Sequence, residues 1–132
     1  MFEDDDYEEN HLTCKVVLLG EAEINKTSII SRFINNTFDE NKFSTTGASY
    51  AIRIMTFDEY GGKSVKFEIW DTACQEKYRS LTHIFCKDID VAILVYDITN
   101  RKTFEEIKNY WYPLVKENAP KNTSKKYLLN LY

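Results

Sequence analysis

Glycine and proline are scarce in this 132-residue chain, which holds four glycines and two prolines. This scarcity excludes collagen-like and low-complexity sequence, both of which depend on these residues. It also restricts any phosphate-binding loop, because such loops use glycine to bring the backbone close to an anion. A hydrophobic content of 43% and a charged content of 29% are typical of one globular domain.

Cysteine and histidine are also few, with three cysteines and two histidines. Their spacing matches neither a disulfide framework nor a zinc site. The longest apolar runs, Val16 to Leu19 and Val91 to Tyr96, are far too short to span a bilayer. The N-terminus lacks the apolar stretch of a secretory signal, and no basic stripe with interleaved aromatics indicates nucleic-acid binding. We therefore expect a cytoplasmic protein that binds no nucleic acid.

Acidic charge is concentrated at the N-terminus, where six of the 21 acidic residues lie between Glu3 and Glu9. The remaining residues carry 15 acidic against 17 basic side chains, so the rest of the chain is close to neutral. A charge run of this kind is typically a solvated tail. We expect residues 1–12 to form a disordered acidic tail and residues 13–132 to form the domain. An acidic arm that docks onto a partner is the alternative interpretation of the tail.

Apolar periodicity predicts strands that alternate with helices. Runs that are apolar on both faces, at 14–20 and 91–97, are typical of buried parallel strands. Two adjacent strands would form a hairpin, so the order predicts a mixed, mainly parallel α/β sheet. In chain order we expect a strand at 14–20, a helix from 28, strands at 49–57 and 65–71 joined by a hairpin at Gly61-Gly62, a short helix within 72–90, a strand at 91–97, a helix at 103–117 bent or loosened at Pro113, and a strand from 126.

The loop between the first strand and the first helix reads G-E-A-E-I-N-K-T, residues 20–27. It matches the phosphate-binding pattern G-x-x-x-x-G-K-[ST] at Gly20, Lys26 and Thr27, with Asn25 in place of the second glycine. In such a loop the backbone N–H groups hold an anion at a helix N-terminus, the lysine neutralises phosphate and the hydroxyl binds Mg²⁺. An ordinary strand-to-helix turn with a surface lysine is the alternative.

Three further segments have a recognisable pattern. They are S-T-T-G-A-S-Y at 44–50, W-D-T-A-C-Q-E at 70–76 and V-Y-D-I-T-N at 95–100. Together with the loop they resemble the Ras superfamily of small GTPases, most of all the Rab branch and its early-endosomal group. The resemblance covers roughly residues 15–122, in family order and at family spacing. It implies a P-loop GTPase-type fold with helices on both faces of the sheet, GTP or GDP and Mg²⁺ as ligands, and a switch function in vesicle traffic.

The resemblance also implies roles for individual residues. Gln75 falls where the family orients the water that attacks the γ-phosphate. The Mg²⁺ ligands would be Thr27, Thr45 and, through a water, Asp71. The nucleotide-binding positions would be Gly20, Glu23, Ile24, Asn25, Lys26, Thr27, Ser28, Phe38, Thr45, Asp71 and Cys74.

Partners would bind at the two switch segments, 37–48 and 72–87, which the γ-phosphate orders and hydrolysis releases. Tyr50, Trp70 and Phe85 fall on the aromatic trio that Rab proteins present to effectors. Packing alone is the alternative role for these three rings. The implied partners are Rab-type effectors, an exchange factor and a GTPase-activating protein, and we expect the chain to be a monomer.

Three residues depart from the family inside its motifs. Asn25 replaces a loop glycine, although asparagine is the residue that best tolerates positive φ after glycine. Glu23 places a negative charge near a polyphosphate. Cys74 replaces the glycine that donates its N–H to the γ-phosphate and serves as the hinge of the second switch. We therefore expect GTP binding and hydrolysis to be impaired.

The end of the sequence also departs from the family. Asn130 falls where the base-recognition motif N-K-x-D would begin, and Leu131 stands in place of its lysine. We expect an incomplete domain that lacks the last strand and helices and any C-terminal lipid anchor. One sheet face would then lack its cover, which would expose Val16, Leu18, Leu128, Leu129 and Leu131. Two alternatives remain open: a degenerate, non-catalytic Rab-like binding protein, and the truncated product of a longer Rab gene.

Overall fold

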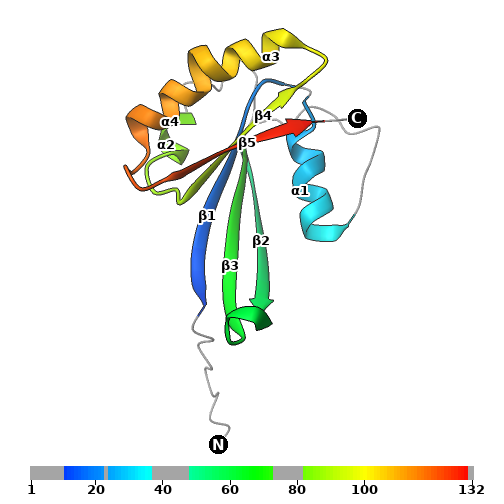
Figure 1. The fold of residues 1–132 in the computed structure, drawn as a ribbon, viewed down its shortest axis with the longest axis vertical. Coiled ribbons are helices and arrows are strands. Elements are labelled where there is room, and N and C mark those ends of the chain that lie inside the picture. Colours follow the sequence, from blue (N-terminus) through cyan, green and yellow to red (C-terminus); the bar gives the residue numbers. More distant parts are fainter. Residues whose placement is uncertain (1–10, 23, 37–47, 73–81, 131–132) are drawn as a thin grey trace, which may run out of the picture.

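In the part of the chain that the structure describes, five strands form one mixed sheet, in the order β2-β3-β1-β4-β5 (Figure 1). The computed structural model describes residues 11–22, 24–36, 48–72 and 82–130. Strands β1, β3, β4 and β5 run parallel, whereas β2 pairs antiparallel with β3 at the edge. The strands are β1 (Leu12–Leu19), β2 (Ala48–Phe57), β3 (Lys63–Thr72), β4 (Val91–Asp97) and β5 (Ser124–Asn130).

Helices cover both faces of this sheet (Figure 1). Helix α1 lies on one face, and the remaining helices lie on the other. The mixed, mainly parallel α/β fold with helices on both faces is therefore confirmed. The helices are α1 (Lys26–Asn35), α2 (Thr82–Phe85), α3 (Arg101–Glu106) and α4 (Tyr112–Asn118), with a 3₁₀ turn at Asp58–Tyr60 and a π-helical segment at Ile107–Trp111.

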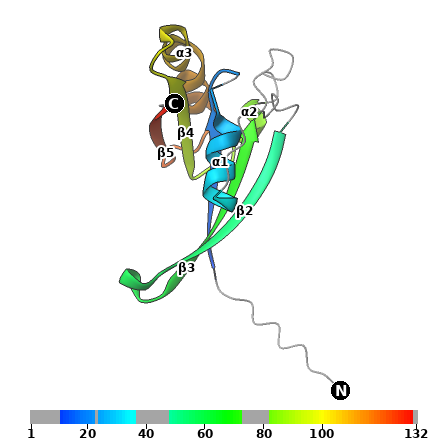
Figure 2. The same cartoon turned by 90° about the vertical axis from the view of Figure 1, so that its right-hand side faces the viewer.

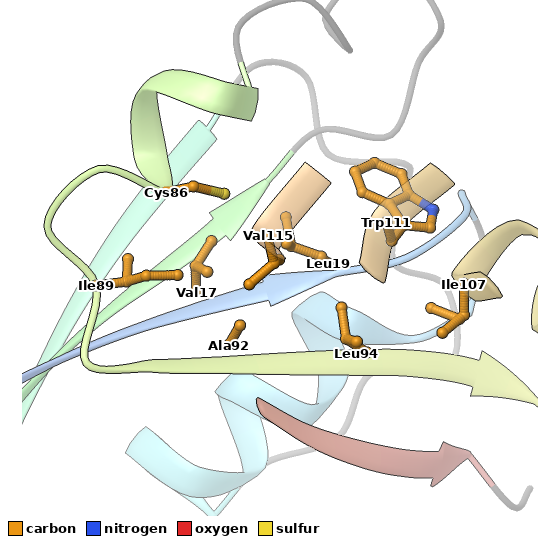
Figure 3. Close-up of a cluster of buried hydrophobic side chains, with 9 residues drawn as sticks. All are labelled: Val17, Leu19, Cys86, Ile89, Ala92, Leu94, Ile107, Trp111 and Val115. Carbon is orange, nitrogen blue, oxygen red and sulfur yellow. The ribbon is translucent and has the colours of Figure 1, made fainter. Parts of the chain in front are cut away.

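Strand β1 supplies side chains to the cores on both faces, because successive residues of a strand point to opposite sides. Val17 and Leu19 pack beneath the helices that follow β4, in a cluster that includes Trp111 (Figure 3). Val16 and Leu18 pack on the α1 side and are only 6% and 2% exposed. The expectation that these two residues would be exposed is therefore wrong, since α1 and its neighbours already bury that part of β1.

The helix after β4 changes its hydrogen-bonding pattern just before Pro113. The N–H of Tyr112 donates to the carbonyl of Ile107, five residues back, where an α-helix would bond four back. Proline has no N–H, and its ring would crowd the carbonyl four residues earlier. The wider π-helical turn accommodates the proline, and the loosening expected at Pro113 takes this form.

The hairpin between β2 and β3 extends away from the rest of the sheet (Figure 2). A 3₁₀ turn at its tip is followed by Gly61 and Gly62, with φ of 74° and 71°, a left-handed conformation that costs glycine nothing. Their N–H groups donate to the carbonyls of Asp58 and Phe57. The glycine pair thus closes the predicted hairpin through a longer turn than two residues would make.

Candidate functional site

The loop after β1 lies at the carboxyl edge of the parallel strands, where α/β sheets of this kind bind ligands. Gly20 begins the loop with a φ of 154°. A Cβ on this residue would stand 2.3 Å from the carbonyl oxygen of Val95 and 2.5 Å from a methyl carbon of Ile24. The loop therefore leaves β1 in direct contact with β4, and only glycine fits at its first position.

Asn25 ends the loop in a left-handed conformation, with φ 64° and ψ 26°. Its carbonyl accepts the first hydrogen bond of α1, from the N–H of Ile29 at 3.0 Å. Positive φ is the property for which the phosphate-binding pattern uses glycine here, and asparagine tolerates it better than most residues. The prediction that asparagine substitutes for the loop glycine is thus confirmed for the backbone geometry.

Lys26 is folded back over the loop and is only 5% exposed. Its ammonium donates to the carbonyl of Gly20 at 3.1 Å and to the carbonyl of Glu21 at 2.7 Å. A surface lysine would not be held in this way, so the alternative of an ordinary turn is wrong. The positive charge is instead fixed at the N-terminus of α1, where the backbone N–H groups and the helix dipole also favour an anion.

Thr27 and Asp71, two of the predicted Mg²⁺ ligands, are brought together from α1 and β3. The Thr27 hydroxyl donates a hydrogen bond to the Asp71 carboxylate. Asp71 is buried at the end of β3, and next to it Thr72 donates to the carbonyl of Leu18 at 2.8 Å. A hydroxyl and a carboxylate oxygen are hard ligands of the kind that Mg²⁺ prefers, so the donor set fits the ion. Within the described residues no group of three His, Cys, Asp or Glu side chains offers another metal site.

Tyr50 and Trp70, two of the predicted effector residues, lie opposite each other on β2 and β3. Their ring centroids are 4.7 Å apart, and the Tyr50 side chain is 44% exposed. Partial desolvation, followed by the charge and hydrogen bond of Glu68, raises the pKa of the Tyr50 hydroxyl. Ile52 and Ile54 continue the same exposed face of β2, at 44% and 49%. Exposure therefore alternates along β2, and Tyr50, Ile52 and Ile54 face outward.

The other predicted site residues differ in burial, and several of them lie outside the described part of the chain. Ile24 is 3% exposed and packs in the core on the α1 side, so only its backbone is available to a nucleotide. Ser28 is half-buried in the first turn of α1. Phe85 ends α2, and its side chain lies outside what the structure describes. Glu23, Phe38, Thr45, Cys74 and Gln75 lie outside the described residues, and their roles stay predictions.

One contact of the loop was missed from the sequence. The indole N–H of Trp111 donates to the carboxylate of Glu21 at 3.1 Å, across 90 residues of sequence. Figure 3 shows the indole nitrogen turned toward the chain that leaves β1. The helical spacing of Ile107, Trp111 and Val115 indicated core packing alone. The signal that would have found the contact is chemical, because a buried tryptophan needs an acceptor for its N–H.

A comparison with protein-family models matches residues 15–130 to the Ras family. The match spans most of the chain and includes both the loop and the Thr27–Asp71 pair. No helix among the described residues is long and apolar enough to cross a membrane. The phosphate-binding loop, the buried lysine and the mixed sheet agree with this match, and this chain belongs to the Ras family of small GTP-binding switch proteins.

Proposed function

We propose that this chain is a Rab-type switch protein that binds GDP and GTP with Mg²⁺ and acts in the cytoplasm in endosomal vesicle traffic. The observation that carries the nucleotide part is the buried ammonium of Lys26, held by the carbonyls of Gly20 and Glu21. The Rab branch and the endosomal step rest on the resemblance of segments 44–50, 70–76 and 95–100.

The loop would hold the β- and γ-phosphates through charge and through its backbone. Lys26 supplies a cation whose position is already fixed by two carbonyls, so little side-chain entropy remains to be lost on binding. Helix α1 points its N-terminus at the same place. Asn25 keeps the backbone conformation of the family loop, although its side chain adds bulk beside the phosphates.

Thr27 and Asp71 would hold Mg²⁺, Thr27 directly and Asp71 through a water. A bound Mg²⁺ neutralises phosphate oxygens and stabilises the charge that develops during transfer. The Thr27 hydroxyl now donates to Asp71, and it would turn its lone pairs toward the ion on binding. Gln75 would orient the attacking water. Glu23 and Cys74 lead us to propose slow hydrolysis compared with the family.

Effectors would dock on the exposed face of the β2–β3 hairpin. Tyr50 and Trp70 form the aromatic part of this face, and Ile52 and Ile54 extend it along β2. Aromatic side chains with one polar end are typical anchors of protein interfaces. Nucleotide-dependent capture of an effector would link this face to the loop.

The test is nucleotide analysis of the purified chain. Mass spectrometry after denaturation is expected to detect stoichiometric GDP or GTP, and Mg²⁺ chelation is expected to accelerate its loss. Lys26→Ala should lose bound nucleotide, whereas Lys108→Ala, which removes an exposed lysine paired with Glu105, should retain it. Nucleotide-free wild-type protein that remains so at millimolar GDP and Mg²⁺ would overturn the proposal.

A second candidate function is partner binding without a nucleotide cycle. The observation that favours it is the exposed Tyr50–Ile54 face, which β2 and β3 build by pairing over their whole length. This candidate predicts that a partner captured by the hairpin stays bound after nucleotide is removed. Loss of capture on removing nucleotide would contradict it and support the switch.

A further inference from the structure

We propose that Trp111 is a positioning residue for the phosphate-binding loop, which it holds through Glu21. The inference rests on the proposed nucleotide binding and adds to it a connection between the loop and the long helix after β4. Nothing in the phosphate-binding pattern requires a contact with that helix.

The contact has the features of a strong hydrogen bond. Trp111 is fully buried, and its indole N–H lies 3.1 Å from the Glu21 carboxylate. Since one partner is ionised, the bond is charge-assisted and stronger than one between neutral groups. A buried indole N–H that loses its acceptor is costly, so the helix and the loop each restrict the other.

Glu21 connects the helix to the lysine that would bind phosphate. Its side chain accepts from Trp111, and its backbone carbonyl accepts from the Lys26 ammonium at 2.7 Å. Fixing Glu21 by its side chain therefore fixes one of the two carbonyls that hold the ammonium. The negative charge of Glu21 also stays paired with the indole instead of turning toward a polyphosphate of like sign.

The helix holds Trp111 firmly enough to act in this way. Ile107 and Val115, four residues to either side, are fully buried in the same cluster. The π-helical segment Ile107–Trp111 widens the turn and keeps this four-residue spacing on one face. Tyr110 packs edge-on against the indole, with ring centroids 4.8 Å apart. The donor therefore has little rotational freedom.

The experiment measures the dissociation rate of a fluorescent GDP from the purified chain and its variants. Trp111→Phe and Glu21→Leu each remove one partner of the bond, and both should release GDP roughly tenfold faster. Glu21→Gln keeps an acceptor oxygen and should restore most of the wild-type rate. Ile89→Ala removes packing from the same cluster at a buried residue between α2 and β4, outside the helix that carries Trp111, and it should lower thermal stability while leaving the rate within about twofold.

Non-additivity is the decisive readout. The double variant Trp111→Phe/Glu21→Leu should release GDP no faster than the faster single variant, because both remove the same bond. A double variant whose GDP release rate is raised by the product of the two single-variant increases would overturn the proposal. A Trp111→Phe rate equal to wild type, or no faster than that of Ile89→Ala, would overturn it as well.

A second measurement separates this inference from the proposed function. The chain has two tryptophans, so two indole N–H resonances are expected in a ¹H–¹⁵N spectrum, and Trp111→Phe assigns them. In the nucleotide-free chain, Glu21→Leu should shift the Trp111 resonance while Glu21→Gln leaves it nearly in place. If wild type binds no GDP, the proposed function fails. An unshifted resonance in Glu21→Leu then also overturns the positioning role.

Discussion

Gly20→Ala is the substitution that most directly tests the contact between the loop and β4. A Cβ at this position would lie 2.3 Å from the Val95 carbonyl oxygen and 2.5 Å from the Ile24 methyl carbon. The Ile24 side chain can rotate away, whereas the Val95 oxygen belongs to a central strand and cannot. The loop or the strand must therefore move.

The expected loss of stability has two parts. Overpacking of a well-filled interior costs about 1–3 kcal/mol, and a φ of 154° costs an alanine about 1 kcal/mol more. The sum of about 2–4 kcal/mol is a large share of the 5–15 kcal/mol that is typical of a folded domain. In a chain of this length it corresponds to a fall of about 10 °C in the melting temperature.

Gly62→Ala is the matched control. Gly62 also has positive φ, 71°, but beyond its own chain neighbours nothing lies within 4 Å of the position its Cβ would take. This variant should lose about 1 kcal/mol from backbone conformation alone. Alanine restricts the backbone of the unfolded chain equally in both variants. The difference between their free energies of unfolding in urea is therefore the cost of the steric overlap at position 20, about 1–3 kcal/mol. Equal losses in the two variants would refute the close approach of the loop to β4.

Three further outcomes are expected. Asn25→Gly should bind GDP about threefold more tightly in a fluorescence titration, because glycine takes the left-handed conformation at no cost. Unchanged or weaker binding would contradict the conclusion that the backbone conformation of Asn25 lowers affinity. Burial raises the pKa of the Cys86 thiol from 9.0 to about 11, so between these pH values the thiol stays protonated in the folded chain while it ionises in the unfolded one. The free energy of unfolding should therefore fall between pH 9 and 11, by about 2–3 kcal/mol at most. Cys86→Ala should remove this pH dependence. Thr103→Val should destabilise the chain by about 1–3 kcal/mol in urea unfolding, because the Asp97 N–H loses its 2.9 Å acceptor, whereas Thr103→Ser should be nearly neutral.

The succession of strands along the chain and the hairpin pairing of two of them could be predicted because the relevant signals are local. The doubly apolar run around Val17 indicated a central strand, and the glycine pair 61–62 indicated the hairpin. That Pro113 would disturb the helix was predictable from proline chemistry, but the π-helical form of the disturbance was not. That form depends on how Trp111 and its neighbours pack against the sheet.

In the site, the residues of the loop motif were predictable, and their mutual contacts were not. Lys26 and Thr27 followed from the pattern, whereas the carbonyls that hold Lys26 depend on the path of the loop in space. The Trp111–Glu21 bond joins segments 90 residues apart. Only the completed sheet brings them together, so no sequence window contains that information.

The tip of the β2–β3 hairpin offers a place to attach probes. It lies at the end of the sheet opposite the loop after β1 (Figure 1), and open space surrounds the Cβ positions of Gly61 and Gly62. Exposed turns of this kind accept inserted residues with little effect on the domain. A peptide tag or fluorophore placed between the two glycines would report on the protein in cells or on a sensor surface, and both the nucleotide loop and the Tyr50–Trp70 pair would remain accessible.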